Sequence, residues 1–298
     1  MANSRRSLKL YNMKIYKMNS FAKIPEGGNP AGVCLDAENL TENQMQEIAN
    51  KAGFSETAFV SRQSENVFNV RFFTPTKEID LCGHATIASF SLLASKGIIK
   101  EGRYKQRTKA GLLDVEITDG NRVFMNQNLP KILGSLTKKE VSKTLDIKES
   151  DTESSLPIEI ISTGIPTIIV PLRSLGKLLK IKPDEEKIRR LTDKNNNALL
   201  HVFATETKNP ESAAHARMFA PGYGIQEESA TGMANGALAC YMFNHYMIKD
   251  PNNLIFEQGY SMQRPSEILG KLKTEGREIK EVIIGGAATI ENELEISL

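Results

Sequence analysis

The sequence predicts an α+β protein whose chain consists of two similar halves. Each half carries the motif Arg-x-Phe-x-Pro, at residues 71–75 and again at residues 217–221. Each copy is followed by a glycine that precedes an apolar helical segment, Gly83 in the first half and Gly232 in the second. With 298 residues the chain is long enough for two domains, so we interpret the repeat as a duplication. The alternative is a chance match, against which the shared order of elements argues.

The first half contains two segments with helical patterns. Thr41 and Gln44 form a capping-box pattern that predicts a helix start, and Gly53 predicts its end. An apolar stretch at residues 85–95 predicts a second helix directly after Gly83. The same half is predicted to contain a glycine-rich turn at residues 27–30 and strands at residues 14–18, 31–35, 56–60, 67–73, 112–117 and 122–126, with Pro130 at its end.

The second half repeats this order after a polar stretch, residues 138–155, that we interpret as a surface helix and linker. A charged helix is predicted at residues 184–191, and an apolar helix runs from residue 231 to about residue 247. Strands are predicted at residues 158–162, 167–171 and 198–204.

These patterns set the expected domain boundaries. Residues 1–12 are polar and basic and precede Met13, so we interpret them as an N-terminal arm or an alternative start. Residues 13–130 form the first predicted domain and residues 131–298 the second, and the last strand is allowed to cross to the first domain.

Composition narrows the class of partner. The 38 Lys and Arg residues nearly balance the 36 Asp and Glu residues, so no basic field favours nucleic acid. Neither a membrane-spanning run nor a secretion signal is visible, and we expect a cytoplasmic protein with a small-molecule partner. Cys34, Cys82 and Cys240 lack CxxC spacing, so we expect no disulfide framework and no metal site.

The two glycine-led helices suggest how a ligand is bound. A helix N-terminus presents unpaired N–H groups and the positive end of the helix dipole, and a glycine lets a ligand approach the backbone. If the halves pack about a pseudo-twofold axis, the helix starts at Gly83 and Gly232 meet and hold a substrate carboxylate from both sides. This arrangement requires neither a metal nor a cofactor.

Glu56 is the candidate acid/base. Aligning the strands before the two Arg-x-Phe-x-Pro motifs places Glu56 against Leu200. Such a carboxylate is either a solvated strand end or an acid/base with a pKa raised by burial, and the strand alone favours the solvated end. His84 either caps the helix, donates to the ligand or packs in the core. Asp80 and Glu228 precede the two helices, where acidic residues often serve only the helix dipole.

Several motifs stand in a fixed order along the chain. They are Gly-Asn-Pro-Ala-Gly-Val at residues 28–33, Ser-Glu-Thr-Ala-Phe-Val at 55–60, Arg-Phe-Phe-Thr-Pro at 71–75, Asp-Leu-Cys-Gly-His-Ala-Thr at 80–86, Arg-Met-Phe-Ala-Pro at 217–221, Ala-Thr-Gly-Met-Ala-Asn-Gly at 230–236 and Gln-Gly-Tyr-Ser-Met-Gln-Arg-Pro-Ser at 258–266. Together they resemble the phenazine biosynthesis PhzF-like family, from about Met13 to the C-terminus.

The resemblance implies the diaminopimelate-epimerase-like fold. Each of its two α+β domains is a barrel-like sheet around a central helix, and the active site lies between them. It also implies cofactor-free proton transfer with Glu56 as the acid/base. The residues expected to bind substrate are Gly83, His84, Glu228, Gly232 and Met233. A free sheet edge in such barrels makes a homodimer possible.

Two departures from the family pattern bear on the substrate. Many members have Asp-Pro-Ala-Thr-Gly-Ser where this chain has Glu228 at the first position and Met233 at the last. The thioether of Met233 cannot replace a serine hydroxyl, which favours a less polar substrate.

The expected function is an isomerase that moves a proton on a small carboxylate-bearing metabolite, and two alternatives stay open. One is an amino-acid racemase or epimerase that depends on Cys82. Related enzymes use two cysteines, and the second position aligns with Ala230 here. The other alternative is a binding protein that kept the cleft and lost the chemistry.

Overall fold

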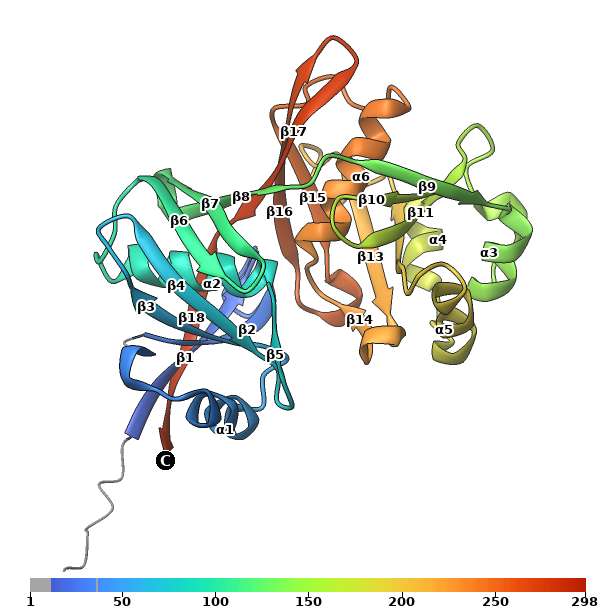
Figure 1. Cartoon of the computed structure of the whole chain (residues 1–298). Helices are drawn as coiled ribbons and strands as arrows, with labels where there is room; N and C mark the ends of the chain where they lie inside the picture. Colours follow the sequence, from blue (N-terminus) through green and yellow to red (C-terminus); the bar gives the residue numbers. More distant parts are fainter. Residues whose placement is uncertain (1–11, 36) are drawn as a thin grey trace, which may run out of the picture.

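The computed structural model describes residues 12–35 and 37–298, and these form two lobes side by side (Figure 1). Of the predicted N-terminal arm, residues 1–11 lie outside the described residues. The first lobe contains β1 (Asn12–Ser20), β2 (Asn29–Cys34), α1 (Glu42–Ala52), β3 (Thr57–Arg62), β4 (Val67–Phe73), β5 (Glu78–Ile79), α2 (Gly83–Ser95), β6 (Gly102–Thr108), β7 (Gly111–Thr118), β8 (Arg122–Gln127) and, from the far end of the chain, β18 (Ala288–Ser297).

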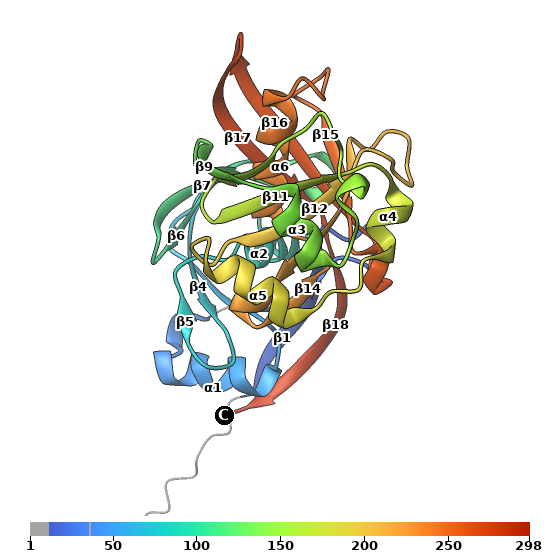
Figure 2. The same cartoon turned by 90° about the vertical axis from the view of Figure 1, so that its right-hand side faces the viewer.

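The second lobe takes up the middle of the chain. It contains β9 (Lys131–Leu136), α3 (Lys138–Leu145), β10 (Ile158–Ser162), β11 (Pro166–Leu172), α4 (Leu175–Lys180), α5 (Glu185–Asp193), β12 (Leu199–Ala204), β13 (Ala214–Ala220), β14 (Ile225–Glu228), α6 (Gly232–Asn244), β15 (Leu254–Gln258), β16 (Ser266–Glu275) and β17 (Glu278–Gly286). Short 3-10 helices lie at Ala37–Asn39, Asp119–Asn121, Glu149–Asp151, Pro221–Tyr223 and Tyr260–Met262. The helices α3, α4 and α5 cover the outer face of this lobe, which faces the viewer in Figure 2.

Both lobes have the same order of strand pairing. In the first lobe β1 pairs antiparallel with β2, β2 parallel with β3, β3 antiparallel with β4, β4 parallel with β6, and β6–β7–β8 continue antiparallel. The second lobe repeats this series with β10, β11, β12, β13, β15, β16 and β17. An identical series of six pairings supports a duplication rather than a chance match of motifs.

The two lobes exchange a strand. β9 follows β8 in the chain but pairs with β10 of the second lobe, and β18 follows β17 but pairs with β1 of the first lobe. In Figure 1 the dark red β18 runs back beside the blue β1. β8 and β17 also pair with each other, so one continuous sheet joins the lobes. The expected domain boundaries stay a prediction. By its place after β8, β9 is the counterpart of β18 after β17, so each lobe takes the last strand of the other repeat.

A buried helix lies at the centre of each lobe. α2 packs against β1, β2, β3, β8 and β18, and α6 packs against β10, β11, β16 and β17. Ten consecutive residues of each helix are buried, residues 84–93 and residues 234–243. Helices without a polar face belong in a core, so each sheet wraps around its helix. The α+β class with two similar lobes, expected from the sequence, is confirmed.

The repeated Arg-x-Phe-x-Pro motif makes the same local structure twice. Arg71 makes two hydrogen bonds to the carboxylate of Glu78, of 2.7 and 2.8 Å, and its guanidinium lies 5.2 Å from the ring centre of Phe73. Arg217 makes two 2.8 Å hydrogen bonds to Glu227, and its guanidinium lies 5.1 Å from the ring of Phe219. The motif therefore ties a central strand to the short strand that follows it.

The register of the strands corrects one sequence alignment. Thr57 pairs with Phe73 in the first lobe, and Leu200 pairs with Phe219 in the second. Since the two phenylalanines are equivalent, Thr57 corresponds to Leu200. Glu56 therefore corresponds to Leu199, one residue earlier than the predicted Leu200. The error has a simple cause. When most residues of a strand are apolar, the sequence pattern does not show which side chains lie on which face of the sheet, so the register is poorly defined.

Several predicted boundaries also change. The glycine-rich turn at residues 27–30 is shorter than predicted, because Asn29 and Pro30 already pair in β2. The surface helix predicted within residues 138–155 is α3, but Val141 and Leu145 point into the core of the second lobe. Within the described ranges, the sequence pattern left β5, β6, β9 and β13–β18 unassigned. None of the helices in residues 12–35 and 37–298 has the length and apolar character needed to span a membrane.

The two arginine motifs offer a matched test of stability. The Arg217 side chain is 5% exposed and also donates to the carbonyls of Leu178 and Ile181, whereas the Arg71 side chain is 33% exposed. Arg217→Ala removes the cationic partner of the mostly buried Glu227 and leaves it only the Ser261 hydroxyl, so we expect a loss of about 3 kcal/mol in the free energy of unfolding. Arg71→Ala should lose about 1 kcal/mol, because Arg71 is partly exposed and Glu78 keeps its ion pair with Lys109.

Urea unfolding of the two variants measures this difference. Equal losses of unfolding free energy in the two variants would show that burial does not determine how much each arginine stabilises the protein. Arg189→Ala serves as the control, because Arg189 is an exposed partner of Glu185 on α5.

Candidate functional site

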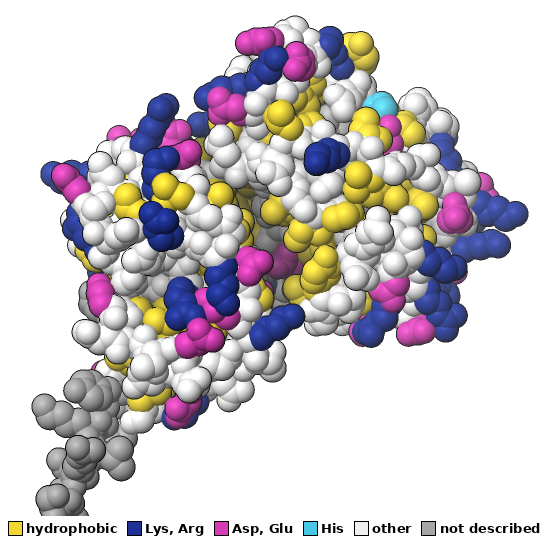
Figure 3. Space-filling model, in the orientation of Figure 1, with side chains coloured by type: hydrophobic (Ala, Val, Ile, Leu, Met, Phe, Trp, Pro, Cys, Tyr) yellow, Lys and Arg dark blue, Asp and Glu magenta, His cyan; other side chains and the backbone are white. Residues whose placement is uncertain are grey.

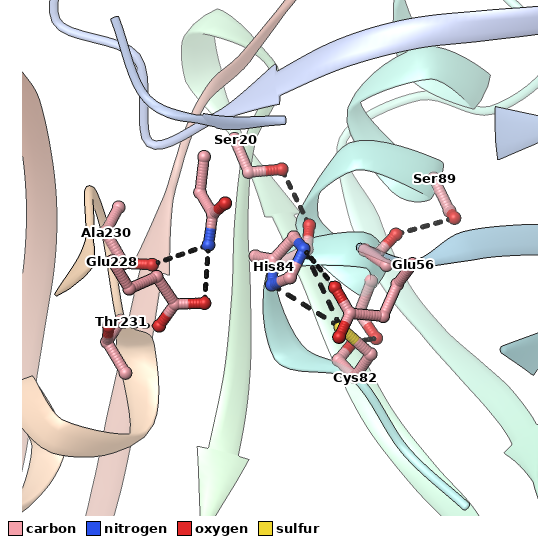
Figure 4. Close-up of polar contacts among 11 residues, drawn as sticks. Ser20, Glu56, Cys82, His84, Ser89, Glu228, Ala230 and Thr231 are labelled. Atoms are coloured by element: carbon pink, nitrogen blue, oxygen red, sulfur yellow. Dashed lines mark hydrogen bonds and ion pairs between the residues drawn. The ribbon is translucent and has the colours of Figure 1, made fainter. Parts of the chain in front are cut away.

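The two central helices begin at the cleft between the lobes. Figure 3 shows a hollow between the lobes, and Figure 4 shows the side chains around it. Glu56, Cys82 and His84 come from the first lobe, and Glu228 and Thr231 come from the second. The site therefore combines residues that are more than 140 positions apart in the chain.

Glu56 is the residue directly before β3. Its carbonyl accepts a hydrogen bond of 2.9 Å from the N–H of Gly32, which fixes the backbone beside β2. The Glu56 side chain is 15% exposed, and its Oε2 lies 3.2 Å from Nε2 of His84. A solvated strand end does not describe this carboxylate, since it is mostly buried against an imidazole.

His84 stands between Glu56 and Cys82 at the start of α2. Its Nδ1 lies 3.4 Å from the sulfur of Cys82, and both side chains are buried. The His84 carbonyl accepts a hydrogen bond of 2.6 Å from the hydroxyl of Ser20 on β1. The hydroxyl of Thr86 donates to the Cys82 carbonyl at 2.8 Å. These bonds fix the backbone that carries the imidazole and the thiol.

The pKa values of Glu56 and His84 shift in opposite directions. Burial opposes ionisation of Glu56, but hydrogen bonding to His84 and its charge outweigh burial and lower the pKa of Glu56 below 4.5. Burial alone would lower the pKa of His84, but Cys82 and Glu56 outweigh it and raise that pKa well above 6.5. Glu56 and His84 therefore stabilise each other's charged forms.

Glu228 ends β14 on the other side of the cleft. Its Oε1 accepts a 2.9 Å hydrogen bond from Nδ2 of Asn29, and its Oε2 accepts one from the hydroxyl of Thr231. Burial raises the pKa of Glu228 above 4.5, although His84, Thr231 and Asn29 oppose the rise. The two carboxylates of the cleft thus sit in environments that shift their pKa values apart.

Asn29 and Gln258 hold the start of α6, and the sequence reasoning did not single them out. Besides Glu228, Asn29 Nδ2 reaches the Ala230 carbonyl at 3.0 Å. Gln258 accepts from the N–H of Thr231 at 3.2 Å and donates to the Glu228 carbonyl at 2.7 Å. Both residues lie inside quoted motifs, at residues 28–33 and 258–266. These motifs were the only signal in the sequence that pointed to Asn29 and Gln258. Their roles depend on contacts with residues more than 25 positions away.

The helix starts in the cleft lack a side-chain cap. The side chains of Cys82 and Thr231, at the N-cap positions of α2 and α6, make no capping hydrogen bond to the first N–H groups of their helices. The other four α-helices in the described part of the chain are each capped by a side chain, from Thr41, Thr137, Ser174 and Asp184. The first N–H groups of α2 and α6 therefore stay available for an anion.

The two predicted glycines differ in their surroundings. A Cβ at Gly83 would meet nothing closer than the Met125 sulfur at 3.9 Å, so protein packing does not require glycine there. A Cβ at Gly232 would lie 3.2 Å from Ile284 and 3.4 Å from Phe21. Space for a ligand beside the backbone is thus greater at Gly83.

Met233 lies at the rim of the second lobe. Its sulfur is 3.8 Å from the hydroxyl of Thr163, and a Cβ on Gly164 would lie 2.8 Å from that sulfur. The side chain therefore rests on the turn between β10 and β11. Counting from the helix starts, Met233 corresponds to His84 of the first lobe, and Leu199 corresponds to Glu56. The ion pair of one lobe is replaced by two apolar residues in the other.

Cys82 has no thiol opposite it in the described residues. The N-cap of α6 corresponds to Cys82, and that position is Thr231 rather than the predicted Ala230. Cys240 is fully buried within α6, and burial raises its pKa to about 12. Burial also raises the pKa of Cys82, although His84 opposes the rise. A two-thiol arrangement is therefore missing from residues 12–35 and 37–298.

Glu56, Cys82 and His84 are also the residues that could hold a metal ion. One donor atom from each, an oxygen, a sulfur and a nitrogen, lies within 4.8 Å of the other two. The sequence-based expectation of no metal stays a prediction.

Comparison with known proteins gives a matching family model and three similar proteins. The family model described as "Phenazine biosynthesis-like protein" matches residues 18–293. The uncharacterized isomerase YfhB of Bacillus subtilis (strain 168) is 36% identical over 287 residues, which cover 94% of this chain and 98% of that protein. The trans-2,3-dihydro-3-hydroxyanthranilate isomerase of Pseudomonas fluorescens is 29% identical over 274 residues, covering 90% of this chain and 94% of that enzyme. The crystal structure of a Bacillus anthracis phenazine biosynthesis protein of the PhzF family has a TM-score of 0.88 at 30% identity, covering 96% of this chain and 99% of that chain.

Replacing His84 tests the origin of the lowered carboxylate pKa. In His84→Asn the imidazole is lost while burial remains, so the pKa of Glu56 should rise relative to the unchanged protein. An NMR titration of carbon-13-labelled glutamate carboxyls measures the shift. His245→Asn, which removes an ion pair with Glu159 elsewhere in the second lobe, should leave Glu56 unchanged. A Glu56 titration that is identical in His84→Asn would disprove the electrostatic coupling.

Proposed function

This chain belongs to the phenazine biosynthesis-like protein family, and we propose that it is a cofactor-independent isomerase that moves a proton on a small carboxylate-bearing metabolite. The family expected from the motifs is thereby confirmed. Its relatives are named isomerases, and one acts on trans-2,3-dihydro-3-hydroxyanthranilate. The names of the relatives support the isomerase class. The substrate and the role of each residue are part of this proposal.

The observation that carries the proposal is the buried Glu56–His84 pair beside two uncapped helix starts. Glu56 is the acid/base. Its carboxylate removes a proton from a carbon next to an activated position, which breaks a C–H bond and forms a carboxylic acid. The carboxylic acid exchanges its proton with solvent and then delivers a proton to another carbon of the substrate, and the carboxylate is restored. The substrate is neither oxidised nor reduced, so the step needs no redox partner.

The helix starts bind the substrate. The free N–H groups at the helix starts of Gly83 and Gly232 donate hydrogen bonds to the substrate carboxylate and stabilise negative charge that develops when the proton leaves. His84 holds Glu56 ionised and ready to accept a proton, since it lowers the carboxyl pKa. Glu228, whose pKa is raised, hydrogen-bonds the substrate from the opposite side of the cleft.

The side chain of Met233 bears on substrate choice. It places a thioether at the rim, against Thr163 and Gly164, where a hydroxyl would offer a hydrogen bond. A site without that donor selects less strongly for a polar group at this position. We therefore propose a substrate that is less polar on the side of the second lobe. A cytoplasmic location and a homodimer also belong to the proposal.

A deuterium-exchange experiment tests the proposal. The protein is incubated in D₂O with unsaturated cyclic amino acids, amino acids, hydroxy acids and trans-2,3-dihydro-3-hydroxyanthranilate, and carbon-bound deuterium is followed by NMR. Exchange into one compound is expected. Glu56→Gln keeps the shape and loses the basic carboxylate, so exchange should fall by a factor of about 100 or more. Glu47→Gln on the exposed face of α1 is the matched control and should exchange normally.

Each other result has a defined meaning. Exchange that survives in Glu56→Gln and is lost in Cys82→Ala would replace the glutamate mechanism with a thiol mechanism. Tight binding of one compound without exchange in the unchanged protein would favour a binding protein instead of an isomerase.

A further inference from the structure

We propose that Glu56, Cys82 and His84 bind a divalent transition-metal ion such as Zn²⁺, and that the bound ion blocks the acid/base site. The three residues present one carboxylate oxygen, one sulfur and one imidazole nitrogen, all within 4.8 Å of one another. This inference uses residues of the proposed active site but does not depend on the proposed reaction, because metal binding is measured without a substrate.

The distances between donors fit a tetrahedral ion. With metal–ligand bonds of about 2.0–2.1 Å to nitrogen and oxygen and about 2.3 Å to sulfur, tetrahedral ligands lie about 3.4 Å apart for N and O and about 3.6 Å apart for N and S. In the structure Nε2 of His84 lies 3.2 Å from Oε2 of Glu56 and 3.9 Å from Sγ of Cys82. Both distances are within a few tenths of an ångström of the expected values, so small side-chain rotations suffice.

The donors stand on parts of the fold that are already fixed. Cys82 and His84 flank the first residue of α2, a helix buried at the centre of the lobe. The Glu56 carbonyl is hydrogen-bonded to Gly32, and the His84 carbonyl to Ser20. A site built on rigid elements loses little conformational entropy when the ion binds.

The chemistry of the donors selects the class of ion. Sulfur and imidazole ligands suit Zn²⁺ and Co²⁺, whereas Mg²⁺ and Ca²⁺ prefer a shell of oxygen ligands. Binding removes the proton of the Cys82 thiol and the proton on Nε2 of His84, and both protons leave to solvent. A dication with one thiolate and one carboxylate gives a neutral site, which is compatible with its burial.

Occupation by the ion has a direct consequence for Glu56. One carboxylate oxygen becomes a metal ligand, and the imidazolium beside it becomes a neutral ligand. The acid/base can then no longer accept a proton freely. Three protein ligands leave a fourth tetrahedral position for water or for a carboxylate in the cleft.

Cobalt spectroscopy tests the inference on the full-length protein. Chelator-treated, reduced protein is titrated with Co²⁺, and a thiolate-to-cobalt absorption band in the near ultraviolet is expected to saturate at one equivalent. Cys82→Ser should lose the band. Glu56→Gln and His84→Asn should each weaken Co²⁺ binding by about tenfold or more. Loss of a residue that only hydrogen-bonds a metal ligand already weakens metal binding by about tenfold, and loss of the ligand itself should cost at least as much. Equimolar Zn²⁺ should displace the cobalt and remove the band.

Cys240→Ala is the matched control, because Cys240 is a buried thiol on the other central helix. It should keep the band unchanged, and circular dichroism checks that every variant is folded. A missing band, or a band that survives in Cys82→Ser, would overturn the inference.

The metal experiment and the exchange experiment separate the two proposals. Proton exchange without a cobalt band would refute the metal site and leave the isomerase proposal intact. A cobalt band in a protein that exchanges no proton even after chelator treatment would support the metal site and count against the isomerase. If both are seen, Zn²⁺ should inhibit exchange and a chelator should restore it.

Discussion

The site depends on keeping two helix starts uncapped inside a largely buried cleft. Buried N–H groups without partners are costly, so everything around them must be fixed by other bonds. Ser20 fixes the carbonyl of His84 at the start of α2, and Gln258 binds both the N–H of Thr231 and the carbonyl of Glu228 at the start of α6. Asn29 joins the two lobes at the same place. The cleft is therefore preorganised by polar side chains from distant segments.

A duplicated scaffold here carries chemistry on one side only. The pairing series, the central helix and the arginine motif occur twice, but the ion pair of Glu56 and His84 occurs once. Its counterparts, Leu199 and Met233, are apolar. This asymmetry gives a substrate one face with an acid/base and one face that positions it. The second lobe still contributes a carboxylate, Glu228. Burial raises the pKa of Glu228, whereas the pKa of Glu56 is lowered.

The sequence predicted features that neighbouring residues determine, and it missed features that depend on contacts between distant segments. The capping box of Thr41 and Gln44 and the glycine-led helices are set by neighbouring residues, and the structure contains them. The arginine motif predicted the duplication correctly because each copy performs the same local task. The one-residue error at Glu56 arose because apolar strands give little register information. The roles of Asn29 and Gln258 require contacts between segments that no local pattern brings together.

The exchange of β9 and β18 has a consequence for how the chain is made. β1 is synthesised first among the described strands, yet its neighbour β18 follows the entire second lobe. During translation the first lobe therefore carries an open edge at β1 until the rest of the chain has left the ribosome. Domains that can close early fold as they emerge, and unpaired strand edges invite aggregation. In this protein β1 can gain its β18 neighbour only after the second lobe has been made, and a truncated product that lacks β18 keeps that edge exposed.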